Sequence, residues 1–164
     1  MEIIEKSWKE FWAYYWRITS RHRIQGIFDW DQKLVSLIEA KCNLTPPKRI
    51  LDLGCCGGDQ AKVFAEKNYS VVGIDIAESL IEYARKQVDA LGLSATFIVN
   101  DMQNINYENE FDVCVLLSGT FGFFTDEKNL DLLRRINVAL IPNGYVFIMY
   151  CSPNRFDQVS MDGN

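Results

Sequence analysis

Five short apolar segments, separated by helical patterns, constrain the fold of this 164-residue chain more than any other feature. They are rich in β-branched residues, end in glycine or polar residues, and span residues 49–54, 70–76, 96–101, 111–117 and 145–151. Strands of a parallel sheet that is covered on both faces have this nearly continuous apolar character. The alternation predicts right-handed βαβ units in a doubly wound, Rossmann-like α/β fold with a mostly parallel sheet and helices on both faces.

The helical patterns between the strands also predict which residues face inward. Thr125 is the expected N-cap of the last helix, which runs to about Leu140. Helices are expected over residues 31–42, 59–67, 79–91 and 126–140, with inward residues Leu34, Val35 and Ile38, then Leu80, Ala84, Val88 and Leu91, then Leu130, Leu133 and Ile136. Pro142, Asn143 and Gly144 are expected to turn the chain into the fifth strand.

The residues before the first strand form a separate helical segment with an aromatic stripe. Its apolar face consists of Ile4, Trp8, Phe11, Trp12 and Tyr15. Core packing is the commoner explanation of such a stripe, and a lid over a ligand is the alternative, because these residues precede a glycine-rich loop. We therefore predict an N-terminal helical lid segment over residues 1–45 and a Rossmann-like domain over residues 46–164, which together form one domain.

Composition excludes several classes of partner. The chain has 17 Lys and Arg against 22 Asp and Glu and no basic stripe, which argues against a nucleic-acid partner. The longest mostly apolar run, residues 113–124, is too short to span a bilayer, so no membrane partner is expected. Five cysteines without a secretory signal predict reduced thiols and a cytoplasmic location. With a single histidine, His22, and no CxxC pair, no metal site is expected.

The stretch RILDLGCCGGDQ, residues 49–60, is the main candidate for a binding site. Parallel sheets bind ligands beyond the carboxyl ends of their strands, where the strand order reverses, and the loop after the first strand lies there. Glycines allow a sharp turn and a close approach of the backbone to a ligand. Asp75 ends the second strand, 21 residues after Gly54, where an acid typically hydrogen-bonds a ribose diol.

The loop also indicates which nucleotide-like cofactor it suits. It does not match GxGxxG, the pattern that an NAD-dependent oxidoreductase would require. Asp52 lies inside the first strand, and a buried acid is costly unless it meets a polar or cationic partner. The ammonium group of an amino-acid-like cofactor would be such a partner, whereas a pyrophosphate would be repelled.

Over about residues 48–150 the sequence resembles class I S-adenosylmethionine-dependent methyltransferases, of the type that acts on small molecules. The resemblance rests on five segments in order and at normal spacing: ILDLGCCGGDQ, VVGIDIAESLIEYAR, VNDMQNI, FDVCVLLSGTFGFF and LIPNGYVFI. It implies S-adenosylmethionine as the cofactor and S-adenosylhomocysteine as its product. It also implies methyl transfer to a small-molecule acceptor that the sequence does not identify.

The same resemblance assigns roles to individual residues. Asp75 would bind the ribose hydroxyls, with Ile76 against the adenine. Asp101 would hydrogen-bond the adenine amino group, with Met102 flanking the ring. The end of the fourth strand would face the methionine part and the methyl group. The predicted cofactor-binding residues are therefore Asp52, Gly54, Cys55, Asp75, Ile76, Asp101, Met102 and Leu117. No catalytic base is assigned, since His22 in RITSRHR is typical of a solvated surface residue.

The sequence departs from the family pattern in two ways. Cys56 stands where the family has its middle glycine. If that position needs a positive φ, a cysteine strains the loop by roughly 1–2 kcal/mol; if it needs only a close approach, the sulfur crowds the cofactor. In addition, five of the family's seven strands are recognisable, which leaves an apolar fifth-strand edge. We therefore expect either a C-terminally short fragment, or a homodimer or partner chain that covers this edge. The alternative function is a non-catalytic or truncated cofactor-binding module that acts through a partner chain.

Overall fold

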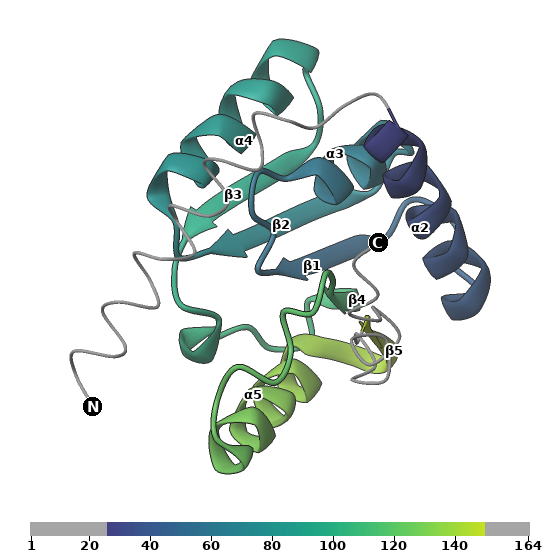
Figure 1. The fold of residues 1–164 in the computed structure, drawn as a ribbon. Coiled ribbons are helices and arrows are strands. Elements are labelled where there is room, and N and C mark those ends of the chain that lie inside the picture. Colours follow the sequence, from purple (N-terminus) through teal and green to yellow (C-terminus); the bar gives the residue numbers. More distant parts are fainter. Residues whose placement is uncertain (1–25, 150–164) are drawn as a thin grey trace, which may run out of the picture.

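A computed structural model describes residues 26–149 (Figure 1). The elements, in chain order, are α2 (Gly26–Cys42), β1 (Arg49–Leu53), α3 (Asp59–Glu66), β2 (Ser70–Asp75), α4 (Glu78–Leu91), β3 (Ala95–Val99), the 3₁₀ helix η2 (Met102–Asn104), β4 (Phe111–Leu116), α5 (Asp126–Ala139) and β5 (Leu140–Ile148). The aromatic stripe over residues 4–15, His22 and the segment from Cys151 onward lie outside the described residues, so the predictions made for them are not tested.

The five strands form one parallel sheet in the order β3-β2-β1-β4-β5 (Figure 1). The order reverses between β1 and β4, which confirms the predicted doubly wound fold. In the register, Asp52 of β1 lies beside Gly73 of β2, and Gly73 lies beside Phe97 of β3. Side chains alternate between the two faces, so Asp52 and Asp75 lie on the same face of the sheet, at its carboxyl edge.

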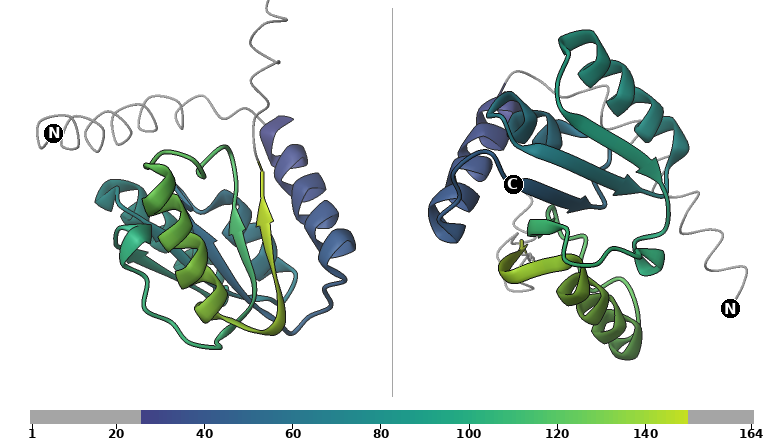
Figure 2. Two further views of the ribbon diagram at one scale, coloured as in Figure 1. Left: turned by 90° about the horizontal axis from the view of Figure 1, so that it is seen from below. Right: turned by 180° about the vertical axis from the view of Figure 1, so that it is seen from behind.

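Helices cover both faces, as predicted. One core cluster joins α2, α3 and α4 to the strands, and a second joins α5 to the opposite face. Figure 2 shows α2 and α5 on opposite sides of the sheet. Side chains that are almost completely buried fill both clusters; they include Ile38, Phe64, Ile81 and Val113 in the first and Leu51, Phe111, Leu132 and Ile136 in the second.

The predicted inward faces are confirmed for α2 and for most of α4. Leu34, Val35 and Ile38 of α2 are buried, and so are Leu80, Ala84 and Val88 of α4. Leu91 is 53 % exposed, contrary to the prediction. It is the last residue of α4, and the left-handed Gly92 that caps the helix turns the chain away there.

The prediction for α5 is wrong at one residue and confirmed at others. Thr125 caps the helix, accepting a hydrogen bond from the Lys128 backbone amide, and Ile136 is buried as predicted. Leu130, however, is 49 % exposed, because the buried stripe runs along Leu132, Ile136 and Ala139. Residues two positions apart on a helix point to nearly opposite sides, so Leu130 and Leu132 cannot both face the sheet.

Strand β5 begins earlier than the sequence indicated. Phe111 pairs with Leu140, but Val113 pairs with Tyr145, so the partner strand advances five residues while β4 advances two. The extra residues 142–144 form an irregularity in which Asn143 has a φ of 65°. Within residues 26–149, no strand pairs with the outer edge of β5, on which Tyr145 is 47 % exposed.

No helix in the described part of the chain combines the length and the apolar character that crossing a bilayer requires.

Candidate cofactor site

The loop after β1 alternates between ordinary and left-handed backbone. Gly54, Cys56 and Gly58 have φ values of 74°, 50° and 77°. The backbone amides of Gly54 and Cys55 both donate to the carbonyl oxygen of Ile74, at 2.7 and 3.1 Å. The loop is therefore tied to β2, and its last residue, Gly58, immediately precedes helix α3.

The two loop cysteines lie in different environments. Cys56 has a positive φ, so the first of the two predicted alternatives holds: the position needs a left-handed residue, and a cysteine there costs about 1–2 kcal/mol. Cys55 is 3 % exposed, and its Sγ would lie 2.9 Å from a β-carbon added at Gly73. Its side chain is thus a packing residue, which leaves only the Cys55 backbone to meet a ligand.

Neighbouring elements lie close to the glycines of the loop. A β-carbon added at Gly54 would collide with the side chain of Thr120, in the loop after β4. A β-carbon added at Gly57 would lie 3.4 Å from the ring of Tyr83 on α4. The glycine loop is therefore enclosed between the segment after β4 and helix α4.

Asp75 organises the edge of the sheet beside this loop. Its Oδ2 accepts a hydrogen bond from the Cys56 backbone amide at 3.0 Å, and its Oδ1 accepts one from Ala77 at 2.8 Å. Burial raises the pKa of the carboxyl, while hydrogen bonds from the backbone of Ala77, Cys56 and Ile76 and from the Cys56 side chain oppose that rise. A carboxylate oxygen can accept two hydrogen bonds, so Asp75 retains the capacity to accept from a diol.

Asp52 is the one buried carboxylate on β1, and it lacks a full set of partners. The residue is 2 % exposed, and its Oδ2 accepts no hydrogen bond from any described residue. Burial, and secondarily the charge of Asp75, raise the pKa of Asp52 to about 7. A buried polar atom without a partner is costly, and a cationic or hydrogen-bonding ligand would relieve the cost. The residues present therefore fit a cofactor with an ammonium group.

The predicted adenine-binding residues lie at the adjacent strand ends. Ile76 follows β2 and Met102 begins η2 after β3, and both are partly exposed. Asp101 caps η2 by accepting from the Gln103 backbone amide at 3.0 Å. The Asn100 amide donates to the Asp75 carbonyl at 3.0 Å, which holds the two strand ends together.

Leu117, the predicted site residue at the end of β4, has a buried side chain. Its side chain is 4 % exposed and belongs to the core cluster that includes α2 and α3. Ser118, the next residue, is exposed and has a φ of 56°. The Thr120 hydroxyl donates to the Leu117 carbonyl, which orders the turn against the glycine loop.

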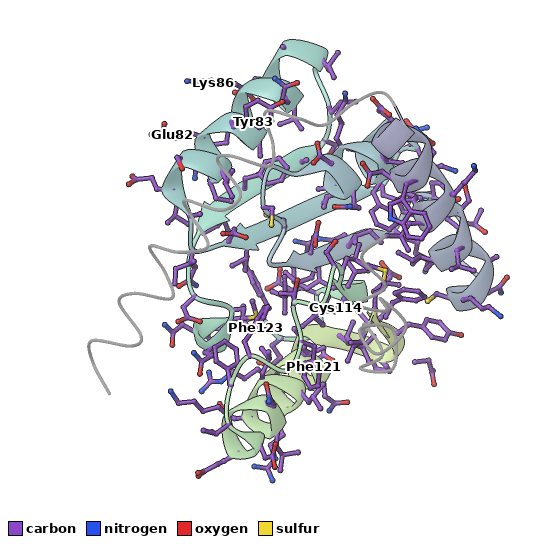
Figure 3. All side chains as sticks on the ribbon, viewed as in Figure 1. Glu82, Tyr83, Lys86, Cys114, Phe121 and Phe123 are labelled. Carbon is purple, nitrogen blue, oxygen red and sulfur yellow. The ribbon has the colours of Figure 1, made fainter. Side chains whose placement is uncertain are left out.

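Some residues at the site were missed by the sequence analysis. Thr120 and Tyr83 enclose the glycine loop; both lie in segments quoted above, but their contact with the loop depends on elements that are distant along the chain. Gln60 donates to the buried Asp31 at 2.7 Å and so joins the start of α3 to α2. Figure 3 shows Tyr83 on α4 and the aromatic residues Phe121 and Phe123 in the segment after β4.

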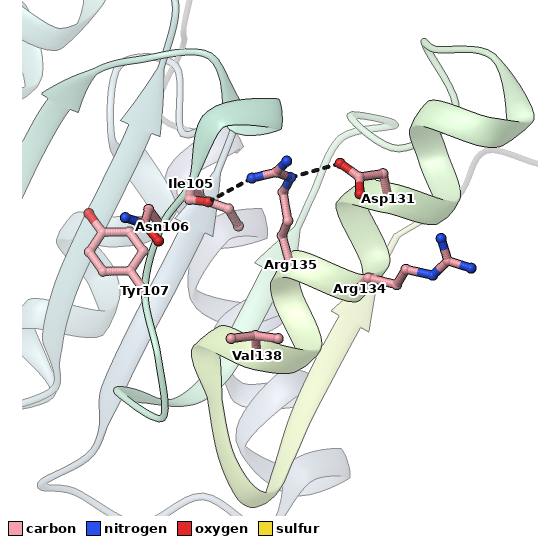
Figure 4. A pocket seen from close by; sticks show the side chains of 7 residues that line it. All are labelled: Ile105, Asn106, Tyr107, Asp131, Arg134, Arg135 and Val138. Carbon is pink, nitrogen blue, oxygen red and sulfur yellow. Dashed lines mark hydrogen bonds and ion pairs between the residues drawn. The ribbon is translucent and has the colours of Figure 1, made fainter.

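A separate depression of about 270 Å³ lies between the segment before β4 and helix α5 (Figure 4). Its lining residues are Ile105, Asn106, Tyr107, Asp131, Arg134, Arg135 and Val138, none of which is a predicted site residue. Arg135 donates to Asp131 at 2.8 Å and is thereby engaged within the protein. This depression is not part of the candidate cofactor site.

Comparison with known proteins identifies the family of this chain. Residues 50–144 match the family model described as "Methyltransferase domain". The demethylmenaquinone methyltransferase of Thermus thermophilus is 32 % identical over 127 residues, which cover 76 % of this chain and 54 % of that protein. Phosphoethanolamine N-methyltransferase 1 of Arabidopsis thaliana is 39 % identical over 114 residues, 68 % of this chain and 23 % of that one. The chain thus spans about half the length, or less, of these relatives.

Solved structures share the fold. The PH0226 protein of Pyrococcus horikoshii has a TM-score of 0.71 at 20 % identity, covering 84 % of this chain and 60 % of that one. An S-adenosylmethionine-dependent methyltransferase of Clostridium acetobutylicum has a TM-score of 0.70 at 17 % identity, covering 92 % and 60 %. From the family match and these likenesses, the chain belongs to the class I S-adenosylmethionine-dependent methyltransferases.

Proposed function

We propose that this chain binds S-adenosylmethionine at the carboxyl edge of its sheet and transfers a methyl group to a small-molecule acceptor. The observation that carries the proposal is the buried Oδ2 of Asp52, which lacks a hydrogen-bond partner among the described residues beside the glycine loop. A dehydrogenase cofactor would bring a pyrophosphate to this loop, and the carboxylate of Asp52 would repel it.

Each strand end has a distinct part in holding the cofactor. Asp52 would take the ammonium of the amino-acid part, and the amides of Gly54 and Cys55 keep the loop in place beside it. Asp75 would accept the ribose hydroxyls on the lone pairs that Cys56 and Ala77 leave open. Ile76 and Met102 would contact the adenine, and Asp101 its amino group.

The chemistry requires little beyond alignment. When bound, the cofactor supplies a methyl group on a positively charged sulfur. The sulfur is a good leaving group, so the methyl group is readily transferred. The protein must then place the acceptor in line with that methyl and exclude water. No nucleophile or triad of this chain is needed for that task. Phe121 and Phe123 in the segment after β4 are suitable for facing the sulfonium charge or an aromatic acceptor; Phe123 is 46 % exposed.

The acceptor class is proposed as a small molecule. The relatives bear names that refer to demethylmenaquinone, phosphoethanolamine and ubiquinone biosynthesis. The net charge of −5 disfavours nucleic acid as a substrate. A cytoplasmic location, a lid formed by residues 1–45, and a second copy or partner chain on the β5 edge are also part of the proposal.

Formation of S-adenosylhomocysteine tests the function. The purified chain is incubated with S-adenosylmethionine and, in turn, a hydroquinone, a catechol, phosphoethanolamine and an amino acid. The proposal expects turnover with at least one acceptor and a loss of turnover in Asp75→Asn. Cofactor binding without turnover on any acceptor would instead support the non-catalytic module.

A further inference from the structure

We propose that Gln60 is a positioning residue for the cofactor. Its hydrogen bond to the buried Asp31 holds the first turn of α3 in the direction in which the amides at the start of that helix meet the carboxylate of the cofactor's amino-acid part. The inference rests on the proposed function, and it concerns the carboxylate, for which the sequence predicted no partner.

The contact between Gln60 and Asp31 joins two helices at the end where the glycine loop lies. Helix α2 packs against α3 (Figure 1). Asp31, near the start of α2, is 3 % exposed, and its Oδ1 accepts a hydrogen bond from Nε2 of Gln60 at 2.7 Å. Gln60 is the second residue of α3, and Gly58, the last residue of the glycine loop, directly precedes that helix. The hydrogen bond therefore acts on the turn into which the glycine loop leads.

A buried carboxylate is a costly means of joining two helices. Removing the charge from water is unfavourable, and apolar side chains of similar shape often hold two elements together at least as well. At the opposite end of the same helices, Lys67 and Glu39 form an ion pair at 2.8 Å that remains partly exposed. Among the side chains that the structure describes, only Asp31 and Asp52 are both charged and buried. A fixed geometry at the start of α3 thus explains the polar contact better than stability does.

Packing holds the start of α3 from another side. A β-carbon added at Gly58 would lie 2.7 Å from the ring of Phe97 and 3.0 Å from the β-carbon of Ala84. Strand β3 and helix α4 therefore limit the movement of this turn, and the hydrogen bond to Asp31 limits it on the side of α2. Together these contacts fix the direction of the helix start beside the glycine loop.

The amides at this helix start are suited to a carboxylate. Gly58, the N-cap of α3, has no side chain that could accept hydrogen bonds from them. The first amides of a helix also have no acceptor within the helix, and they favour an anion. In the cofactor, the carboxylate and the ammonium are attached to the same carbon atom. With the ammonium at Oδ2 of Asp52, which has no hydrogen-bond partner among the described residues, the carboxylate would lie toward the start of α3.

The test is calorimetric titration of the natural chain, Gln60→Met and Lys67→Met with two ligands. One ligand is S-adenosylhomocysteine, and the other is methylthioadenosine, which has the same nucleoside and thioether but no amino-acid part. Gln60→Met keeps the length of the side chain and removes the donor. We expect it to bind S-adenosylhomocysteine about 5- to 10-fold more weakly, as the loss of one hydrogen bond implies, and to bind methylthioadenosine as the natural chain does. Lys67→Met removes the contact at the far end of the same helices and should change neither affinity.

A double variant separates positioning from stability. When Asp31→Leu is combined with Gln60→Met, both partners of the hydrogen bond become apolar. The double variant should therefore unfold at a urea concentration similar to that of the natural chain. It should nevertheless show the same selective loss of affinity for S-adenosylhomocysteine, because the start of α3 is no longer held by a directed contact. If Gln60→Met does not fold, the double variant takes its place in the titration.

The outcomes separate this inference from the proposed function. Natural affinity for S-adenosylhomocysteine in the double variant, equal weakening of both ligands, or the same selective loss in Lys67→Met would overturn the role of Gln60 and leave the proposed function standing. Failure of the natural chain to bind S-adenosylhomocysteine would overturn the proposed function and this inference together.

Discussion

The ring of Phe97 on β3 lies directly against Gly58, where a β-carbon would be 2.7 Å from the ring carbon Cζ. The same ring fills the space beside Gly73 on β2, where a β-carbon would be 2.6 Å away. Two glycines from different elements thus accommodate one buried aromatic side chain. Core packing therefore requires a glycine at residue 58, in addition to any requirement that a ligand sets.

This packing predicts the cost of a methyl group at residue 58. Gly58→Ala adds a β-carbon where φ is 77° and the ring leaves no room, so we expect the free energy of unfolding to fall by about 2–4 kcal/mol. The matched control is Gly92→Ala, since Gly92 has a φ of 62° and nothing within 4 Å of the added carbon. In urea denaturation, Gly92→Ala should lose only about 1 kcal/mol in the free energy of unfolding. Equal losses in the two variants would mean that Phe97 moves aside at no cost.

The left-handed cysteine predicts a stabilising substitution. Cys56→Gly relieves the backbone strain at a φ of 50°, and we expect a gain of about 1 kcal/mol in the free energy of unfolding. Asn109→Gly is a useful comparison, because Asn109 has a φ of 51° but asparagine tolerates that region and should gain less. Thermal unfolding of both variants measures the difference, and a loss of stability in Cys56→Gly would contradict the strain argument.

Asp52 predicts an unusual dependence of stability on pH. Its pKa is about 7 in the folded chain, against an ordinary value of 3.8, so the folded state holds a proton that the unfolded state releases. The resulting stabilisation is complete below about pH 4 and is lost as pH rises through 7, a change of a few kcal/mol at most. In Asp52→Asn this decline should disappear. Urea denaturation of both proteins from pH 4 to 8 measures this decline in the free energy of unfolding. Parallel pH dependences in the natural chain and in Asp52→Asn would show that Asp52 is already ionised.

Substitutions of Asp75 and Asp112 should differ in their effect on cofactor binding. Asp75→Asn should weaken cofactor binding about 10- to 100-fold and lower the free energy of unfolding by about 1–3 kcal/mol, because the amide offers one acceptor oxygen in place of two and leaves the Cys56 or the Ala77 amide without its acceptor. Asp112 accepts from Lys48 at 2.7 Å and from the Arg49 amide at 2.8 Å, at the amino end of the strands. Asp112→Asn should therefore lose about 1 kcal/mol of stability and leave binding unchanged. Titration and denaturation of both variants separate the two roles; equal affinity in Asp75→Asn would exclude it from the site.

The sequence was informative where a local pattern decides the structure. The apolar segments located all five strands, and the acid at residue 75 was expected to lie beside the glycine loop. The contact between Thr120 and Gly54 depends on the neighbouring positions of β1 and β4, which follow from strand order and not from spacing. Leu130 was wrongly predicted to face inward because apolar residues at 130, 132 and 133 allow two helical faces, and only packing on the sheet selects one. The left-handed φ of Cys56 was one of two alternatives that the sequence could not separate.

The most direct test of the central claim is calorimetric titration of the natural chain with S-adenosylhomocysteine at pH 8, with Asp75→Asn and Asp112→Asn alongside. Asp52 is largely ionised at that pH, so it can hold the ammonium group. We predict saturable one-site binding in the micromolar range, retained by Asp112→Asn and strongly weakened in Asp75→Asn. Absence of binding by the natural chain, or equal binding by all three proteins, would contradict a cofactor site at the carboxyl edge of this sheet.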